Sequence, residues 1–109
     1  MASTYKVLGQ SAPSATTNTD VYTVPSARES VISTIVIANR EATAGTFRLA
    51  VRPNGASIAD QHYLAYDVPI AANDSTTLTL GITVDATDVI TFYASSANMS
   101  INVFGSEIS

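Results

Sequence analysis

The chain has 109 residues, the size of a single domain. Only 13% of the residues are charged and 46% are hydrophobic, which predicts a folded protein and excludes a solvated disordered chain. The net charge of −4 argues against nucleic acid and anionic membranes as partners, and the absence of Cys excludes disulfides and thiolate chemistry.

Turn-forming segments recur along the chain at the spacing of an all-β sandwich, and eight short strands are expected between them. In chain order the expected strands are Thr4–Leu8, Val21–Val24, Ser30–Ala38, Thr46–Arg52, Gln61–Val68, Thr76–Thr83, Val89–Ala94 and Met99–Phe104. The first two are expected at sheet edges, and the second ends at Pro25, which has no N–H to donate. No segment has the periodicity of an amphipathic helix, so a turn near residues 56–61 is the only helical feature expected.

The side-chain pattern indicates which strand faces are buried. Ser30–Ala38 is apolar at both parities and is expected to be a central strand covered on both faces. Thr46–Arg52 alternates, so one face is expected in the core and the other in water. The core side of Gln61–Val68 stays open, because aromatic residues occupy both of its faces.

These patterns predict an all-β, single-domain antiparallel β-sandwich of about eight strands, jelly-roll-like, with immunoglobulin-like connectivity as the alternative. Residues 1–19 are expected to form an N-terminal strand and an extended arm, and residues 20–109 the sandwich, together one domain. Neither a secretory signal nor a transmembrane segment is expected, because no apolar run is long enough.

The residues do not indicate an enzyme, a cofactor or a metal site. His62 is the single histidine, and no triad spacing surrounds it. Asp60 and His62 lack a third ligand for a metal. Asp74, Asp85 and Asp88 fall in predicted turns, where carboxylates ordinarily bond to backbone N–H groups.

Five residues are candidates for an interface. Arg48 and Arg52 share the polar face of one strand and could pair with acids of a neighbouring subunit, since Arg suits bidentate carboxylate contacts. Among the five tyrosines, Tyr5, Tyr63 and Tyr66 are candidates for surface positions with a hydroxyl that reaches a partner. Solubilising charge and packing at the core edge are the alternatives.

A recurring order of short segments runs through nearly the whole chain: YKVLGQ at 5–10, YTVP at 22–25, ANR at 38–40, FRLAVRPNG at 47–55, QHY at 61–63 and AND at 72–74. This order resembles small virion structural proteins of tailed bacteriophages, especially those of cyanobacterial and marine phages. The resemblance implies a β-sandwich that assembles as an oligomer and carries no catalytic signature.

The function implied by the resemblance is that of a non-enzymatic capsid decoration (cement) protein that stabilises the phage head. It would act in the virion, assembled in the host cytoplasm, as a homo-oligomer with a trimer favoured. The major capsid protein or other virion proteins would be its partners, with residues 1–19 available to reach a neighbour. A tail, baseplate or fibre-associated adaptor is the alternative, and a carbohydrate-binding sandwich, with Tyr63, Tyr66 or Tyr93 stacked on a sugar, is a third hypothesis.

Overall fold

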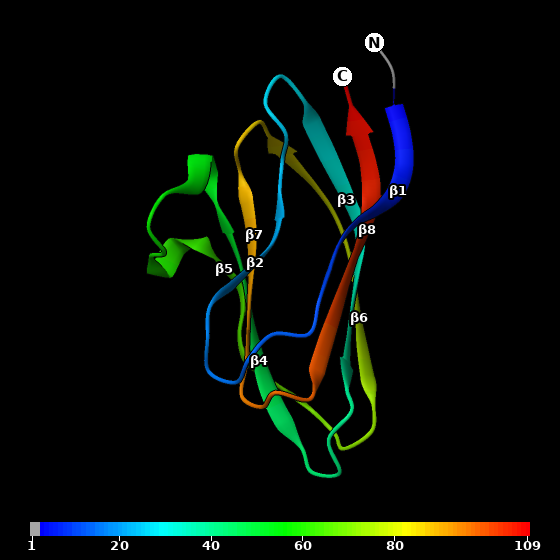
Figure 1. Cartoon of the computed structure of the whole chain (residues 1–109), viewed down its shortest axis with the longest axis vertical. Helices are drawn as coiled ribbons and strands as arrows, with labels where there is room; N and C mark the ends of the chain where they lie inside the picture. The colour runs from blue at the N-terminus through cyan, green and yellow to red at the C-terminus, as the bar shows by residue number, and fades with distance from the viewer. Residues whose placement is uncertain (1–2) are drawn as a thin grey trace.

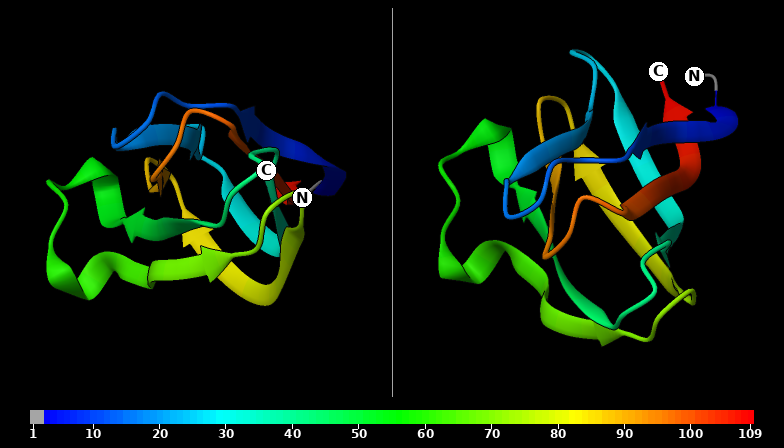
Figure 2. Two further views of the ribbon diagram at one scale, coloured as in Figure 1. Left: turned by 90° about the horizontal axis from the view of Figure 1, so that it is seen from below. Right: turned by 60° about the horizontal axis from the view of Figure 1, so that its bottom comes forward.

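The computed structural model describes residues 3–109 as eight β-strands with two short 3₁₀ turns and no α-helix among them (Figure 1). The strands are β1 (Ser3–Ser11), β2 (Thr19–Thr23), β3 (Glu29–Asn39), β4 (Gly45–Arg52), β5 (Tyr63–Ile70), β6 (Ser75–Asp85), β7 (Val89–Ala94) and β8 (Met99–Ile108). The turns η1 (Pro53–Gly55) and η2 (Asp60–His62) lie between β4 and β5, in a connection that projects from one side of the molecule (Figure 2).

The strands form two antiparallel sheets of four strands each. Sheet A has the order β1-β8-β3-β6 and sheet B the order β2-β7-β4-β5. The antiparallel pairs are β4 with β5, β3 with β6, β2 with β7 and β1 with β8. The first half of the chain therefore pairs with the second half in reverse order, as in one long hairpin that ends at the β4–β5 connection. This connectivity is that of a jelly roll, as the sequence predicted, and not the immunoglobulin-like alternative.

The core lies between the sheets and is built from the predicted alternation. Phe47 and Leu49 of β4 are fully buried, as are Phe92 of β7 and Ile101 and Val103 of β8. The rings of Phe47 and Phe92 lie 6.1 Å apart and join the middle strands of sheet B. As predicted, β1 and β2 are edge strands and β3 is central.

The expectation that β3 is covered on both faces was wrong. Ile32, Ile35 and Ile37 are buried in the core, whereas Val31 and Val36 on the other face are only partly buried. Nothing in the described chain packs over this outer face as a further layer, since sheet A has sheet B on one side only. Apolar residues at both parities therefore mark an outer face that is apolar but still accessible.

The polar face of β4 is less wet than the alternation predicted. Ala50 on this face is 1% exposed, and the side chains of Arg48 and Arg52 are 25% and 16% exposed. Side chains from β5 and β7 lie beside Arg48, and side chains from β2 and β7 lie beside Arg52. The alternation within β4 alone does not show that side chains of neighbouring strands cover part of its outer face.

The N-terminal segment belongs to the sandwich over its described length. β1 pairs with β8 from Ser3 to Ser11, and Thr16 donates its N–H to the carbonyl of Ala94 at 2.8 Å. Pro13, which lies in the chain between Ser11 and Thr16, is buried. The expected extended arm is therefore folded onto the molecule from residue 3 to residue 19, and its first two residues lie outside the described part of the chain.

Candidate functional site

Four of the five side chains predicted for an interface lie on the outer face of sheet B. Arg48 and Arg52 extend from β4, and Tyr63 and Tyr66 extend from β5, its neighbour in the sheet. The fifth, Tyr5, lies on β1 at the edge of sheet A. The predicted residues therefore divide between two surfaces of the molecule.

The guanidinium of Arg48 contacts two tyrosine rings, one from each neighbouring strand. Its central carbon lies 4.1 Å from the ring centre of Tyr66 and 4.3 Å from that of Tyr93. Arg48 Nε donates to Asp67 Oδ1 at 2.7 Å, and this hydrogen bond raises the pKa of Arg48 above its ordinary value. We call Tyr66, Arg48 and Tyr93 the tyrosine–arginine stack.

A bulge in β5 builds this stack. The register of β5 on β4 shifts between Phe47 and Leu49, so that Tyr66 and Asp67 both lie opposite Arg48. Asp67 has φ 51°, a left-handed conformation that costs a residue other than glycine about 1 kcal/mol or more. Bulges of this kind re-aim side chains, and here the bulge brings an aromatic ring and a carboxylate to one guanidinium.

Arg52 holds several segments of its own chain together. Its Nη2 lies 2.8 Å from Asp20 Oδ1, its Nε donates to Thr91 Oγ1 at 3.0 Å, and its Nη1 donates to the carbonyls of Gly55 and Ala56. Both candidate arginines thus have a carboxylate partner within the chain, and pairing across a subunit boundary stays a prediction for their remaining donors.

Tyr63 and Tyr66 form a second aromatic contact beside the stack. Their ring centres lie 4.8 Å apart with the planes at 73°, an edge-to-face arrangement. Together with Asp60 they line an open cavity of about 320 Å³. Tyr66 is 54% exposed, so the ring that holds Arg48 also faces solvent.

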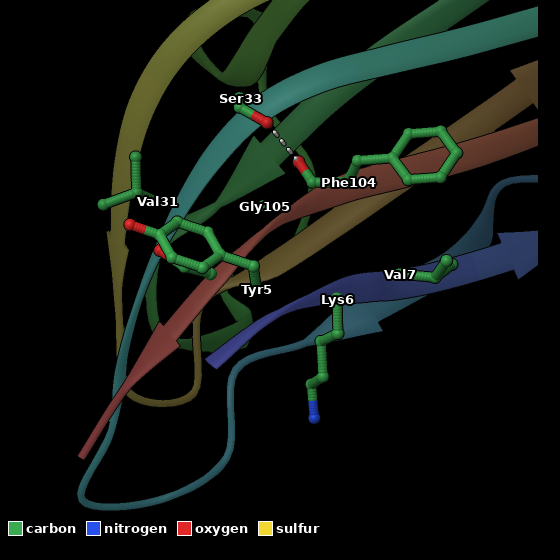
Figure 3. Close-up of a pocket in the computed structure, with 8 residues that line it drawn as sticks. Tyr5, Lys6, Val7, Val31, Ser33, Phe104 and Gly105 are labelled. Atoms are coloured by element: carbon green, nitrogen blue, oxygen red, sulfur yellow. Dashed lines mark hydrogen bonds between the residues drawn. The ribbon is translucent and has the colours of Figure 1, made fainter. Parts of the chain in front are cut away.

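On sheet A, Tyr5 borders an apolar groove of about 480 Å³ (Figure 3). Tyr5 is 85% exposed and Val7 46% exposed, and Val31 and Phe104 line the same groove. Lys6 points away from Tyr5 and Val7 in the close-up. We call this surface the sheet-A groove.

Glu107 is a buried carboxylate, 5% exposed, that is not among the residues predicted for a site. Lys6 Nζ lies 2.9 Å and Arg28 Nη1 3.1 Å from its Oε1, and Tyr22 donates to its Oε2 at 2.7 Å. The hydrogen bonds from Lys6 and then Tyr22 hold the pKa of Glu107 below its ordinary value, while burial raises the pKa of Tyr22 to about 12. The buried residues of β8 occupy odd positions, from Met99 through Val103. If this alternation is continued to the end of the strand, it places Glu107 on the buried face.

The remaining candidate residues have local roles. His62 Nδ1 accepts the N–H of Ala59 at 3.0 Å in the turn η2. Asp74, Asp85 and Asp88 each accept backbone N–H groups, which confirms the predicted turn chemistry. In residues 3–109 no three His, Asp or Glu side chains come together as a group that could hold a metal ion.

Comparison with models of protein families, with curated proteins and with solved structures gave no match to the chain. Within the described residues, no helix is long and apolar enough to cross a membrane.

Proposed function

We propose that this chain is a non-enzymatic virion structural protein, a capsid decoration (cement) protein that binds the phage head as a homo-oligomer, with a trimer favoured. The observation that carries the proposal is the sheet-A groove. Exposed apolar side chains gathered on one face are typical of surfaces that bind other proteins. Tyr5 and Val7 stand out from such a face, beside the partly buried Val31 and Phe104.

The architecture suits a protein that works by bridging its neighbours. Most of the described residues lie in paired strands, so little order is lost when the faces of the sheets are covered. The groove lies beside β1, an edge strand whose outer hydrogen-bonding groups have no partner strand within residues 3–109. Apolar area and a free strand edge at one place support attachment to the major capsid protein or to a second copy.

Copy number in the phage that carries the protein tests this proposal. Heads purified without tails should contain on the order of hundreds of copies, because a decoration protein occupies repeated lattice positions. Quantitative mass spectrometry of separated heads and tails measures this number. A small number of copies retained with the tails would contradict decoration and support a tail, baseplate or fibre adaptor.

Variants of the groove test the proposed surface. Tyr5→Ser together with Val7→Ser should lower the amount of protein bound to heads by about ten-fold, since exposed apolar anchors carry much of the energy of an interface. Thr79→Ala, at an exposed position on β6 of the same sheet, is the control. Undiminished binding of the double variant would overturn the assignment of this surface.

A further inference from the structure

The cavity beside the tyrosine–arginine stack has the features of a sugar-binding site. We propose that Asp60, Tyr63 and Tyr66 bind a neutral glycan on the outer face of sheet B, with a sugar ring against the tyrosines and its hydroxyls on Asp60 and the phenols. This activity goes beyond capsid decoration and uses a different surface from the sheet-A groove.

The two rings offer the kind of surface that a sugar ring needs. A pyranose has an apolar C–H face and a rim of hydroxyls, and a tyrosine combines an apolar ring with a polar tip in the same way. Tyr63 and Tyr66 meet edge to face at 4.8 Å, and Tyr66 is 54% exposed. The exposed part of Tyr66 therefore offers an apolar surface to a sugar ring, with Tyr63 beside it.

The polar groups around these rings are available to a ligand. In the described part of the chain, neither the Asp60 carboxylate nor the hydroxyls of Tyr63 and Tyr66 make a hydrogen bond or an ion pair. The buried Tyr22 differs, because its hydroxyl is bonded to both Ser30 and Glu107. A carboxylate and two phenols can therefore accept and donate hydrogen bonds to sugar hydroxyls.

The site is held in place before a ligand arrives. Arg48 packs on the Tyr66 ring at 4.1 Å and is itself fixed by Asp67 at 2.7 Å. The strained φ of 51° at Asp67 is the cost of this arrangement. Fixing a side chain in advance lowers the entropy that binding must overcome, which matters for weak ligands such as sugars.

The charges around the cavity favour a neutral ligand. Asp67 neutralises Arg48, which leaves the Asp60 carboxylate as the charge in the cavity. An acidic sugar would meet this carboxylate as a like charge. A cationic ligand would have to share the Tyr66 ring with the guanidinium of Arg48.

Titration of the full chain with neutral oligosaccharides of glucose, galactose and mannose, followed by amide NMR shifts, tests the site. At least one of them should give saturable shifts centred on η2 and β5. Tyr66→Ala should lower the affinity about ten-fold and Asp60→Asn about three-fold, whereas Tyr66→Phe keeps most of it because the ring remains. Tyr5→Ala, which removes another exposed tyrosine ring but on sheet A, should leave the affinity unchanged.

Several outcomes would overturn the proposal. These are the absence of saturable shifts up to about 10 mM of every neutral oligosaccharide, saturable shifts for choline chloride or a sialylated glycan alone, and an unchanged affinity in folded Tyr66→Ala. Thermal melting of each variant shows whether it is folded. Failure of capsid binding by the sheet-A groove variants leaves this result unaffected, so the two proposals can fail separately.

Discussion

Tyr22 of β2 and Glu107 of β8 join the two sheets through a buried hydrogen bond of 2.7 Å. Ser30 lies 2.6 Å from the same phenol, and Lys6 and Arg28 reach the other oxygen of the carboxylate. The network lies at the end of the sandwich where the start of β1 pairs with the end of β8 (Figure 1). It therefore ties the first strand, the last strand and the opposite sheet to one carboxylate.

Glu107→Gln should destabilise the protein by about 2 kcal/mol, because hydrogen bonds to a charged group each contribute more than neutral ones. Urea unfolding at neutral pH measures the change. Glu29→Gln is the matched control, since Glu29 is exposed and has no ion pair within the described chain. Equal midpoints for the two variants would show that the network contributes no stability.

The stability that Glu107 provides should disappear in acid. Its pKa is lowered in the folded state, first by the hydrogen bond from Lys6, so its contribution is complete above the unfolded pKa of about 4.5. The contribution is lost as the pH falls from there through the folded pKa. The difference in unfolding free energy between the native chain and Glu107→Gln should therefore shrink steadily below about pH 4.5. A constant difference would contradict this.

Tyr22 should produce the opposite dependence at high pH. Burial raises its pKa from 10.0 to about 12, so its contribution is complete below the unfolded pKa and is lost as the pH rises through the folded one. Between pH 10 and about pH 12 the native chain should lose stability relative to Tyr22→Phe, which cannot ionise. Parallel unfolding curves across this range would refute the assignment.

The jelly roll was predictable because each strand reports its own buried face. Phe47 and Leu49 show the core side of β4 by simple alternation, and the spacing of turns gives the number of strands. The two edge strands also followed, the second of them from Pro25 at its end. These features depend on a few neighbouring residues at a time.

The sites depend on the register between strands that are far apart in the chain. A short stretch of sequence does not show this register. Tyr66 and Asp67 meet at Arg48 because β5 bulges against β4, and no dipeptide signals that bulge. Glu107 lies inside because β8 continues past Phe104 between β1 and β3. The sequence had suggested that β8 ended at Phe104, where the apolar run gives way to Gly, Ser and Glu.

Asn39, at the end of β3, is a second buried polar residue that local pattern did not identify. It is 2% exposed. Its Nδ2 lies 3.0 to 3.3 Å from the carbonyls of Thr43, Ile70 and Ala71, and its Oδ1 accepts the N–H of Glu41 at 3.0 Å. One amide thus satisfies the backbone of two connections, the one after β3 and the one after β5.

Asn39→Asp should destabilise the chain by about 3 kcal/mol at neutral pH, because a carboxylate would face three carbonyl oxygens without donors. The loss should be smaller in acid, where the new carboxyl is protonated and can donate one hydrogen bond. Unfolding in urea at two pH values measures both effects. Asn18→Asp, at an exposed position, is the control, and equal losses for the two variants would contradict the role of Asn39.

Two glycines should respond to alanine for different reasons and by different amounts. A Cβ at Gly105 of β8 would lie 2.0 Å from the backbone oxygen of Val31, so β8 and β3 would have to separate. At Gly81 of β6 nothing lies within 4 Å, but φ is 63°. Gly105→Ala should therefore cost about 3 kcal/mol by overpacking, and Gly81→Ala about 1 kcal/mol by backbone strain. Urea unfolding measures the two costs, and a Gly105→Ala loss no larger than that of Gly81→Ala would show that the close approach of β8 and β3 does not require glycine at position 105.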